Sequence, residues 1–119
     1  MIKVEDIILL HSIVSNKYEI INNNIQSCLS SIDYYESLED KISSIIRAIV
    51  KNHYFLDGNK RTALATYFIL SDLYDLEIIY TDDKLGYIFE DIAKNNYSVE
   101  EISNILFNKD NKKGNINDR

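Results

Sequence analysis

The sequence predicts an all-α fold, in which a small bundle of helices packs around one central buried helix. Three observations support this fold class. The 119-residue chain contains no proline and only three glycines, so few residues interrupt a helix. Its apolar residues recur at helical spacing through most of the chain. The segment 61–75 is apolar on almost every side, which is typical of a helix that other helices surround.

Length and composition are those of one globular domain with a single core. A formal charge of −6 and a pI near 4.8 argue against a nucleic-acid-binding surface. The one cysteine, Cys28, excludes an internal disulfide and fits a reducing cytoplasm. No apolar run reaches transmembrane length, and the N-terminus lacks the basic region of a signal peptide. We therefore expect a cytoplasmic protein without membrane contact.

The N-terminal third contains two predicted helices and a loop. The first helix covers 3–15, where His11 lies on or near the apolar stripe. A histidine at the core edge is the favoured interpretation of His11 over a catalytic one. The second helix covers roughly 19–31, although a run of three asparagines inside it forms helix poorly. Residues 30–37 are expected to form a loop.

The clearest helical pattern begins at Ser37, where the segment 37–40 is a variant capping box with aspartate in the final position. The apolar residues that follow at helical spacing predict a core stripe; they are Leu38, Ile42, Ile45, Ile46 and Ile49. Ser43 and Ser44 fall on the other face, which is expected to be polar. The helix is expected to end at Asn52-His53, so that His53 is directed at the segment that follows.

Two further helices are predicted in the C-terminal half. Thr81, followed by two aspartates, predicts the start of a helix that continues to about residue 94. Ser98 and Glu101 form a full capping box for a last helix that ends near residue 107. From Asn108 the residues are almost entirely polar, so 108–119 is expected to be a disordered tail. The expected domain is therefore 1–107.

The segment between the 37–53 helix and the 61–75 helix carries the densest chemistry in the chain. Gly58 and Asn59 tolerate the positive φ that a sharp turn requires. The segment leads into a helix N-terminus, where backbone N–H groups and the helix dipole favour an anion. Lys60 and Arg61 add two positive charges at the same place. These residues predict a site for a phosphate chain.

Two more residues of this segment complete the predicted site. Asp57 is a hard oxygen ligand, and Mg²⁺ usually binds through one or two carboxylates together with substrate phosphates. His53 is the residue of this segment suited to proton transfer near neutral pH. The residues therefore predict a nucleotide and Mg²⁺ site with one general base. The alternative for each residue alone is ordinary structure: a helix cap, a turn or a solvated surface pair.

The run from His53 to Ala63, His-Tyr-Phe-Leu-Asp-Gly-Asn-Lys-Arg-Thr-Ala, resembles the signature of the Fic/Doc superfamily, and specifically of its Doc (death on curing) branch. The Fic branch characteristically has glycine where this chain has Lys60, and it transfers AMP. The resemblance implies a Fic/Doc-type helical bundle that transfers the terminal phosphate of ATP, or of another nucleoside triphosphate, to a Ser/Thr hydroxyl of a target protein.

The same resemblance implies roles for the site residues. His53, Lys60 and Arg61 would be catalytic, with His53 deprotonating the acceptor hydroxyl. Gly58, Asn59, Lys60 and Arg61 would bind the nucleotide phosphates, and Asp57 would hold Mg²⁺. In this superfamily a flap upstream of the motif binds the target segment. Residues 30–37 are one candidate for this flap, and the packing of their two tyrosines on the domain edge is an equal alternative.

The family also suggests partners. The implied target is elongation factor Tu, whose modification would block translation, and the implied role is that of a toxin checked by a separate antitoxin. The chain has no Ser/Thr-x-x-x-Glu-Gly/Asn segment, the self-inhibiting element of many Fic proteins. Two alternatives stay open: a Fic-like AMP transferase, and an inactive nucleotide- or protein-binding module of the same fold.

Overall fold

The computed structural model describes residues 3–15, 29, 32–52 and 58–108, and all regular structure in these ranges is helical. The described elements are one short 3₁₀ helix, η2 (Ile32–Tyr34), and the α-helices α1 (Val4–Ser15), α2 (Leu38–Asn52), α3 (Asn59–Leu73), α4 (Asp82–Lys94) and α5 (Val99–Phe107). The predicted all-α fold is confirmed.

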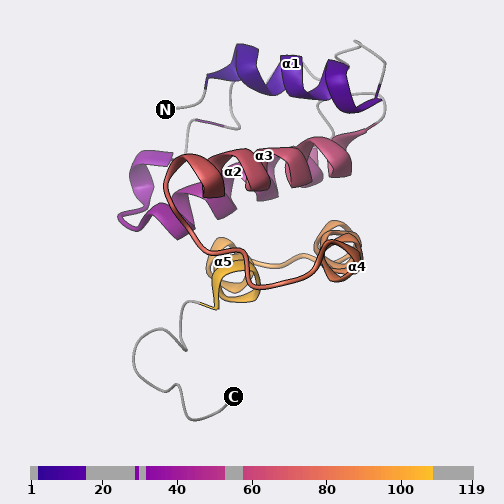
Figure 1. The fold of residues 1–119 in the computed structure, drawn as a ribbon. Coiled ribbons are helices and arrows are strands. Elements are labelled where there is room, and N and C mark those ends of the chain that lie inside the picture. Colours follow the sequence, from indigo (N-terminus) through magenta and orange to yellow (C-terminus); the bar gives the residue numbers. More distant parts are fainter. Residues whose placement is uncertain (1–2, 16–28, 30–31, 53–57, 109–119) are drawn as a thin grey trace.

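The helices lie in three layers (Figure 1). Helices α2 and α3 form the middle layer, with α1 on one side and α4 and α5 on the other. The helix predicted to be central, α3, therefore contacts α1, α2 and α4. It is not buried on almost every side as expected, because Ile69 and Leu73 on its outer face are 45% and 65% exposed.

Helix α2 begins as the sequence predicts. The hydroxyl oxygen of Ser37 accepts a hydrogen bond from the backbone N–H of Asp40 at 3.1 Å. The four isoleucines of the predicted stripe are fully buried; they are Ile42, Ile45, Ile46 and Ile49. The expectation that Ser43 and Ser44 lie on an outer polar face is wrong, since they are 0% and 3% exposed. The reason is that α2 packs against α3, α5, α4 and η2, so several of its faces are covered.

The starts of α4 and α5 match their predicted caps. The Thr81 hydroxyl oxygen accepts a hydrogen bond from the backbone N–H of Lys84 at 3.3 Å. Ser98 and Glu101 form the complete capping box: each side chain accepts from the backbone N–H of the other, at 3.1 and 2.9 Å. Each box residue thus satisfies a donor that a helix start leaves without an intrahelical partner.

A cluster of aromatic rings joins α3 to the α4–α5 layer. Tyr67 is fully buried and its ring centroid lies 5.9, 5.7 and 5.5 Å from those of Phe68, Phe89 and Phe107. The interplanar angles of 46° to 57° are tilted arrangements, which aromatic pairs prefer to a face-to-face sandwich.

Two cations of α2 bind the C-terminal end of α4 and the residues after it. The Nε of Arg47 donates a hydrogen bond to the carbonyl oxygen of Tyr97 at 2.7 Å. The ammonium of Lys51 donates to the carbonyl oxygens of Ala93 and Asn95. Positive groups are favourable at a helix C-terminus, where carbonyl oxygens lack intrahelical partners, so these contacts fix α4 against α2.

The N-terminal part is described only in segments. His11 of α1 was expected at the core edge and is fully buried. The expected helix over 19–31, apart from Leu29, lies outside the described residues. Of the expected tail over 108–119 only Asn108 is described, where it is the C-cap of α5 and its backbone N–H donates to the carbonyl oxygen of Asn104 at 2.9 Å. Within the expected loop, Tyr34 ends the 3₁₀ turn and is 86% exposed, so its side chain does not pack on the domain edge. In the described part of the chain no helix has both the length and the apolar character needed to cross a membrane.

Candidate functional site at the start of α3

The predicted site lies where α2 leads into α3. Helix α2 ends at Asn52 and α3 begins at Asn59, so the motif connects the two helices of the middle layer. Residues 53–57 lie outside the described residues. The predicted base His53 and the predicted metal ligand Asp57 are among them, and both remain predictions. The structure places the other four predicted residues together at the start of α3, with Gly58 as its N-cap and Asn59, Lys60 and Arg61 in its first turn.

Gly58 is the N-cap of α3 and adopts the left-handed conformation, with φ 79° and ψ 14°. Residues with a Cβ atom rarely adopt this region, because the Cβ approaches the neighbouring carbonyl oxygen. The carbonyl oxygen of Gly58 accepts hydrogen bonds from both the hydroxyl and the backbone N–H of Thr62, at 2.8 and 2.9 Å. The prediction that glycine is needed for a sharp turn here is confirmed.

The first turn of α3 is electrostatically unlike those of the helices that follow. It contains no acidic residue, whereas α4 and α5 each begin with two. Lys60 and Arg61 place two cations there instead, and the Arg61 side chain is exposed. Cations oppose the positive end of the helix dipole, so this turn suits an anionic ligand that interacts with both the backbone and the side chains.

The ammonium of Lys60 is bound to a carboxylate of another helix. Its Nζ donates hydrogen bonds to Oε1 and Oε2 of Glu90 on α4, at 2.7 and 2.9 Å. The two side chains are 44% and 47% exposed. The hydrogen bonds from Lys60, and after them its positive charge, lower the pKa of the Glu90 carboxyl. The cation predicted to meet the phosphate is therefore paired with a carboxylate in the described structure.

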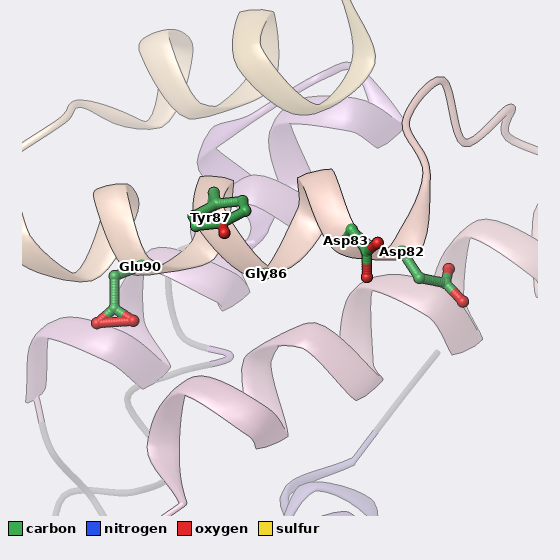
Figure 2. A pocket seen from close by; sticks show the side chains of 5 residues that line it. All are labelled: Asp82, Asp83, Gly86, Tyr87 and Glu90. Carbon is green, nitrogen blue, oxygen red and sulfur yellow. The ribbon is translucent and has the colours of Figure 1, made fainter.

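Glu90 also borders a surface pocket of about 580 Å³. The pocket is lined by one face of α4, at Asp82, Asp83, Gly86, Tyr87 and Glu90 (Figure 2). In Figure 2 the two aspartates lie at the beginning of α4 and Glu90 lies further along the same helix. Asp82 and Asp83 at the beginning of α4 give this pocket negative charge, which repels a phosphate chain.

The described residues contain no cluster of three or more His, Cys, Asp or Glu side chains that could hold a metal ion. Mg²⁺ bound to a nucleotide takes many of its ligands from phosphate oxygens and water. Asp57, the predicted ligand, lies outside the described residues, and its role stays a prediction.

Comparison with known proteins decides the family. A model of the Fic/DOC family matches residues 2–70. The chain belongs to the Fic/DOC family. The matched range includes the motif, helices α1 and α2 and most of α3. The resemblance inferred from the motif is thus confirmed, and Glu90 lies beyond the matched range of this family member.

A curated relative of this Fic/DOC chain is a protein named "Toxin Doc" from Mycolicibacterium smegmatis. The two proteins are 40% identical over 40 residues, which are 34% of this chain and 31% of the relative. The chain therefore matches about a third of that relative's length. This similarity agrees with the resemblance to the Doc branch.

Sequence reasoning missed the contact between Glu90 and the predicted site residue Lys60. The residue lies 30 positions after Lys60, on a helix whose pattern identifies only an apolar face and a polar face. Nothing in the local sequence indicates which cation a glutamate on that polar face will meet, because the packing of α4 against α3 decides it.

Proposed function

We propose that this protein is a Doc-like toxin that transfers the terminal phosphate of a nucleoside triphosphate to a Ser/Thr hydroxyl of a target protein. The observation that carries the proposal is the identity and place of Lys60. It stands in the first turn of α3, two positions after the left-handed Gly58, at the motif position where the Fic branch has glycine.

The proposed chemistry assigns each motif residue one task. His53 accepts the proton of the acceptor hydroxyl, while the oxygen of that hydroxyl forms a bond to the terminal phosphorus. The bond from that phosphorus to the bridging oxygen breaks, and a nucleoside diphosphate leaves. Lys60 and Arg61 neutralise charge on the transferred group, which is the main requirement of phosphoryl transfer. A positioned base contributes about 10²- to 10⁴-fold.

The start of α3 would bind the nucleotide phosphates through backbone groups at Gly58 and Asn59 and through the two cations that follow. Asp57 would hold Mg²⁺, which, when bound, supplies positive charge to the phosphates. The side chain of Lys60 favours transfer of the terminal phosphate over AMP. A glycine at this position would leave room for an interior phosphate, whereas lysine fills that room with its stem.

We further propose elongation factor Tu as the target and a separate antitoxin as the inhibitor. The support for the toxin role is the family membership together with the name of the similar protein, "Toxin Doc". A cytoplasmic place of action would follow from such a target.

The decisive experiment supplies the purified protein with ATP labelled at either the α- or the γ-phosphate. A desalted bacterial lysate, and separately purified elongation factor Tu, serve as acceptors. Label transfer from the γ-position alone supports the proposal, and transfer from the α-position alone identifies an AMP transferase instead. Transfer from neither position, with binding of ATP retained, identifies a binding module. The His53→Ala protein is the control for lysate kinases.

A further inference from the structure

The bond between Lys60 and Glu90 joins the motif to a helix outside the matched range of the family. Both carboxylate oxygens of Glu90 accept from the same ammonium, at 2.7 and 2.9 Å. Two hydrogen bonds to one carboxylate therefore restrain the position of Nζ. An ammonium has three N–H donors, so these two bonds leave it able to donate one more.

We propose that Glu90 is a positioning residue of the site, which holds the ammonium of Lys60 at the start of α3 for transfer of the terminal phosphate. The inference rests on the proposed function and adds to it a residue that lies outside the motif. Glu90 acts through Lys60 and needs no contact with the nucleotide.

The lysine side chain gives the physical reason for such a residue. Its compact charge is carried on a flexible four-carbon stem, and Lys60 is 44% exposed, so packing alone does not select one rotamer. Phosphoryl transfer depends on placing charge to within about an ångström of the productive position. A carboxylate bound at both oxygens supplies the missing restraint.

Glu90 itself stands on a firmly packed part of α4. The neighbouring residue Phe89 is 1% exposed and Ile92, two positions on, is fully buried. The end of the helix is bound by cations of α2, where the Lys51 ammonium donates to the carbonyl oxygen of Ala93. A restraint is effective only when its own support is rigid, and the helix backbone that carries Glu90 meets that condition.

The test measures the rate of γ-label transfer into desalted lysate protein over a range of ATP concentrations. The proteins are wild type, Glu90→Gln, Lys60→Met and the double variant. Glu90→Gln keeps the shape of the side chain and removes its charge. We expect its kcat to fall roughly 10- to 100-fold, while the KM for ATP changes by less than about threefold. The double variant should be no slower than Lys60→Met, because Glu90 has no role once its partner is gone.

The matched control is Glu77→Gln, which removes the same charge from an exposed glutamate in the connector after α3 and should keep the wild-type kcat. Melting temperatures of all variants establish that they are folded. Three results would overturn the inference. The first is an unchanged kcat in Glu90→Gln, and the second is a faster reaction with a lower KM in that variant. The third is a double variant that is slower than Lys60→Met by the full loss of Glu90→Gln. Wild-type protein that transfers no γ-label would instead remove the proposed function, and with it this role.

Discussion

The phenolic hydroxyl of Tyr67 donates a hydrogen bond to the backbone carbonyl oxygen of Leu106, with 3.2 Å between the two oxygens. This bond ties the middle of α3 to the end of α5, within the aromatic cluster that includes Phe89 and Phe107. Burial, and after it the charge of Tyr80, raise the pKa of Tyr67 to about 12.

The first prediction concerns alkaline unfolding. The unfolded chain loses the Tyr67 proton near pH 10.0, while the folded chain keeps it to about pH 12. The contribution of this group to the free energy of unfolding is therefore complete below pH 10 and is lost as the pH rises through 12. The total loss is roughly 3 kcal/mol. Urea unfolding across this range should show a shallower decline in Tyr67→Phe than in wild type.

At neutral pH, Tyr67→Phe should itself cost about 1 kcal/mol, because the variant leaves a buried carbonyl oxygen without its donor. Tyr87→Phe, at a tyrosine that is 79% exposed, is the control and should leave neutral-pH stability unchanged. Equal alkaline slopes in wild type and Tyr67→Phe would show that other groups control unfolding there.

The second prediction concerns the contact between α2 and the residues after α4. Arg47→Met keeps the apolar stem but removes the guanidinium that binds the carbonyl oxygen of Tyr97 at 2.7 Å. We expect a loss of about 2 kcal/mol in the free energy of unfolding, the usual value for a hydrogen bond from a charged donor. Lys84→Met, at an exposed lysine of α4, should lose less than about 0.5 kcal/mol. Similar losses in both variants would contradict the assigned role.

The third prediction concerns the left-handed N-cap. Gly58→Ala should lower the free energy of unfolding by about 1–2 kcal/mol, because an alanine at φ 79° is strained. Gly58→Asn should lose less, since asparagine tolerates this conformation. Gly86→Ala in α4 is the matched contrast: a Cβ there meets nothing within 4 Å, so alanine should stabilise the helix by roughly 0.5–1 kcal/mol. A Gly58→Ala protein as stable as wild type would refute the strain.

These residues show what the sequence predicts well and why. The helix starts at Thr81 and Ser98 are encoded by side chains within three residues of the cap, so local sequence suffices. The same holds for the turn at Gly58. The burial of Ser43 depends instead on how helices distant in sequence pack against α2, which local periodicity does not encode.

The candidate site also has a part that local sequence predicts and a part that it does not. The motif assembles its residues within one short segment, so the cationic first turn of α3 was predictable from residue types alone. The counter-charge Glu90 comes from a helix that packs onto α3 only in the folded protein. The predicted roles of His53 and Asp57 belong to the part of the motif outside the described residues, and experiments must test them.

The fourth prediction is that His53→Ala lowers the transfer rate by about 10²- to 10⁴-fold. The reason is that the motif contains no other group suited to accept the proton of the acceptor hydroxyl near neutral pH. The γ-labelled ATP assay gives the rate, and the melting temperature should stay at the wild-type value. A variant that kept most of its activity would identify His53 as a helix cap.

The fifth prediction is that Lys60 selects the phosphate that is transferred. Lys60→Gly should lower γ-phosphate transfer by orders of magnitude, roughly 10²-fold or more, and should permit some AMP transfer in the space that the stem vacates. Parallel assays with α- and γ-labelled ATP measure both reactions. If Lys60→Gly transfers γ-phosphate as fast as wild type, Lys60 is not the selector.

The hydrogen bonds of Arg47 and Lys51 to the end of α4 have a mechanical consequence. They couple α2 to α4, which carries Glu90, while the C-terminal end of α2 at Asn52 directly precedes the proposed base. A bound protein that tilted α2 would therefore displace both the residue before the base and the helix that carries Glu90. Such a protein could inhibit the reaction without entering the nucleotide site.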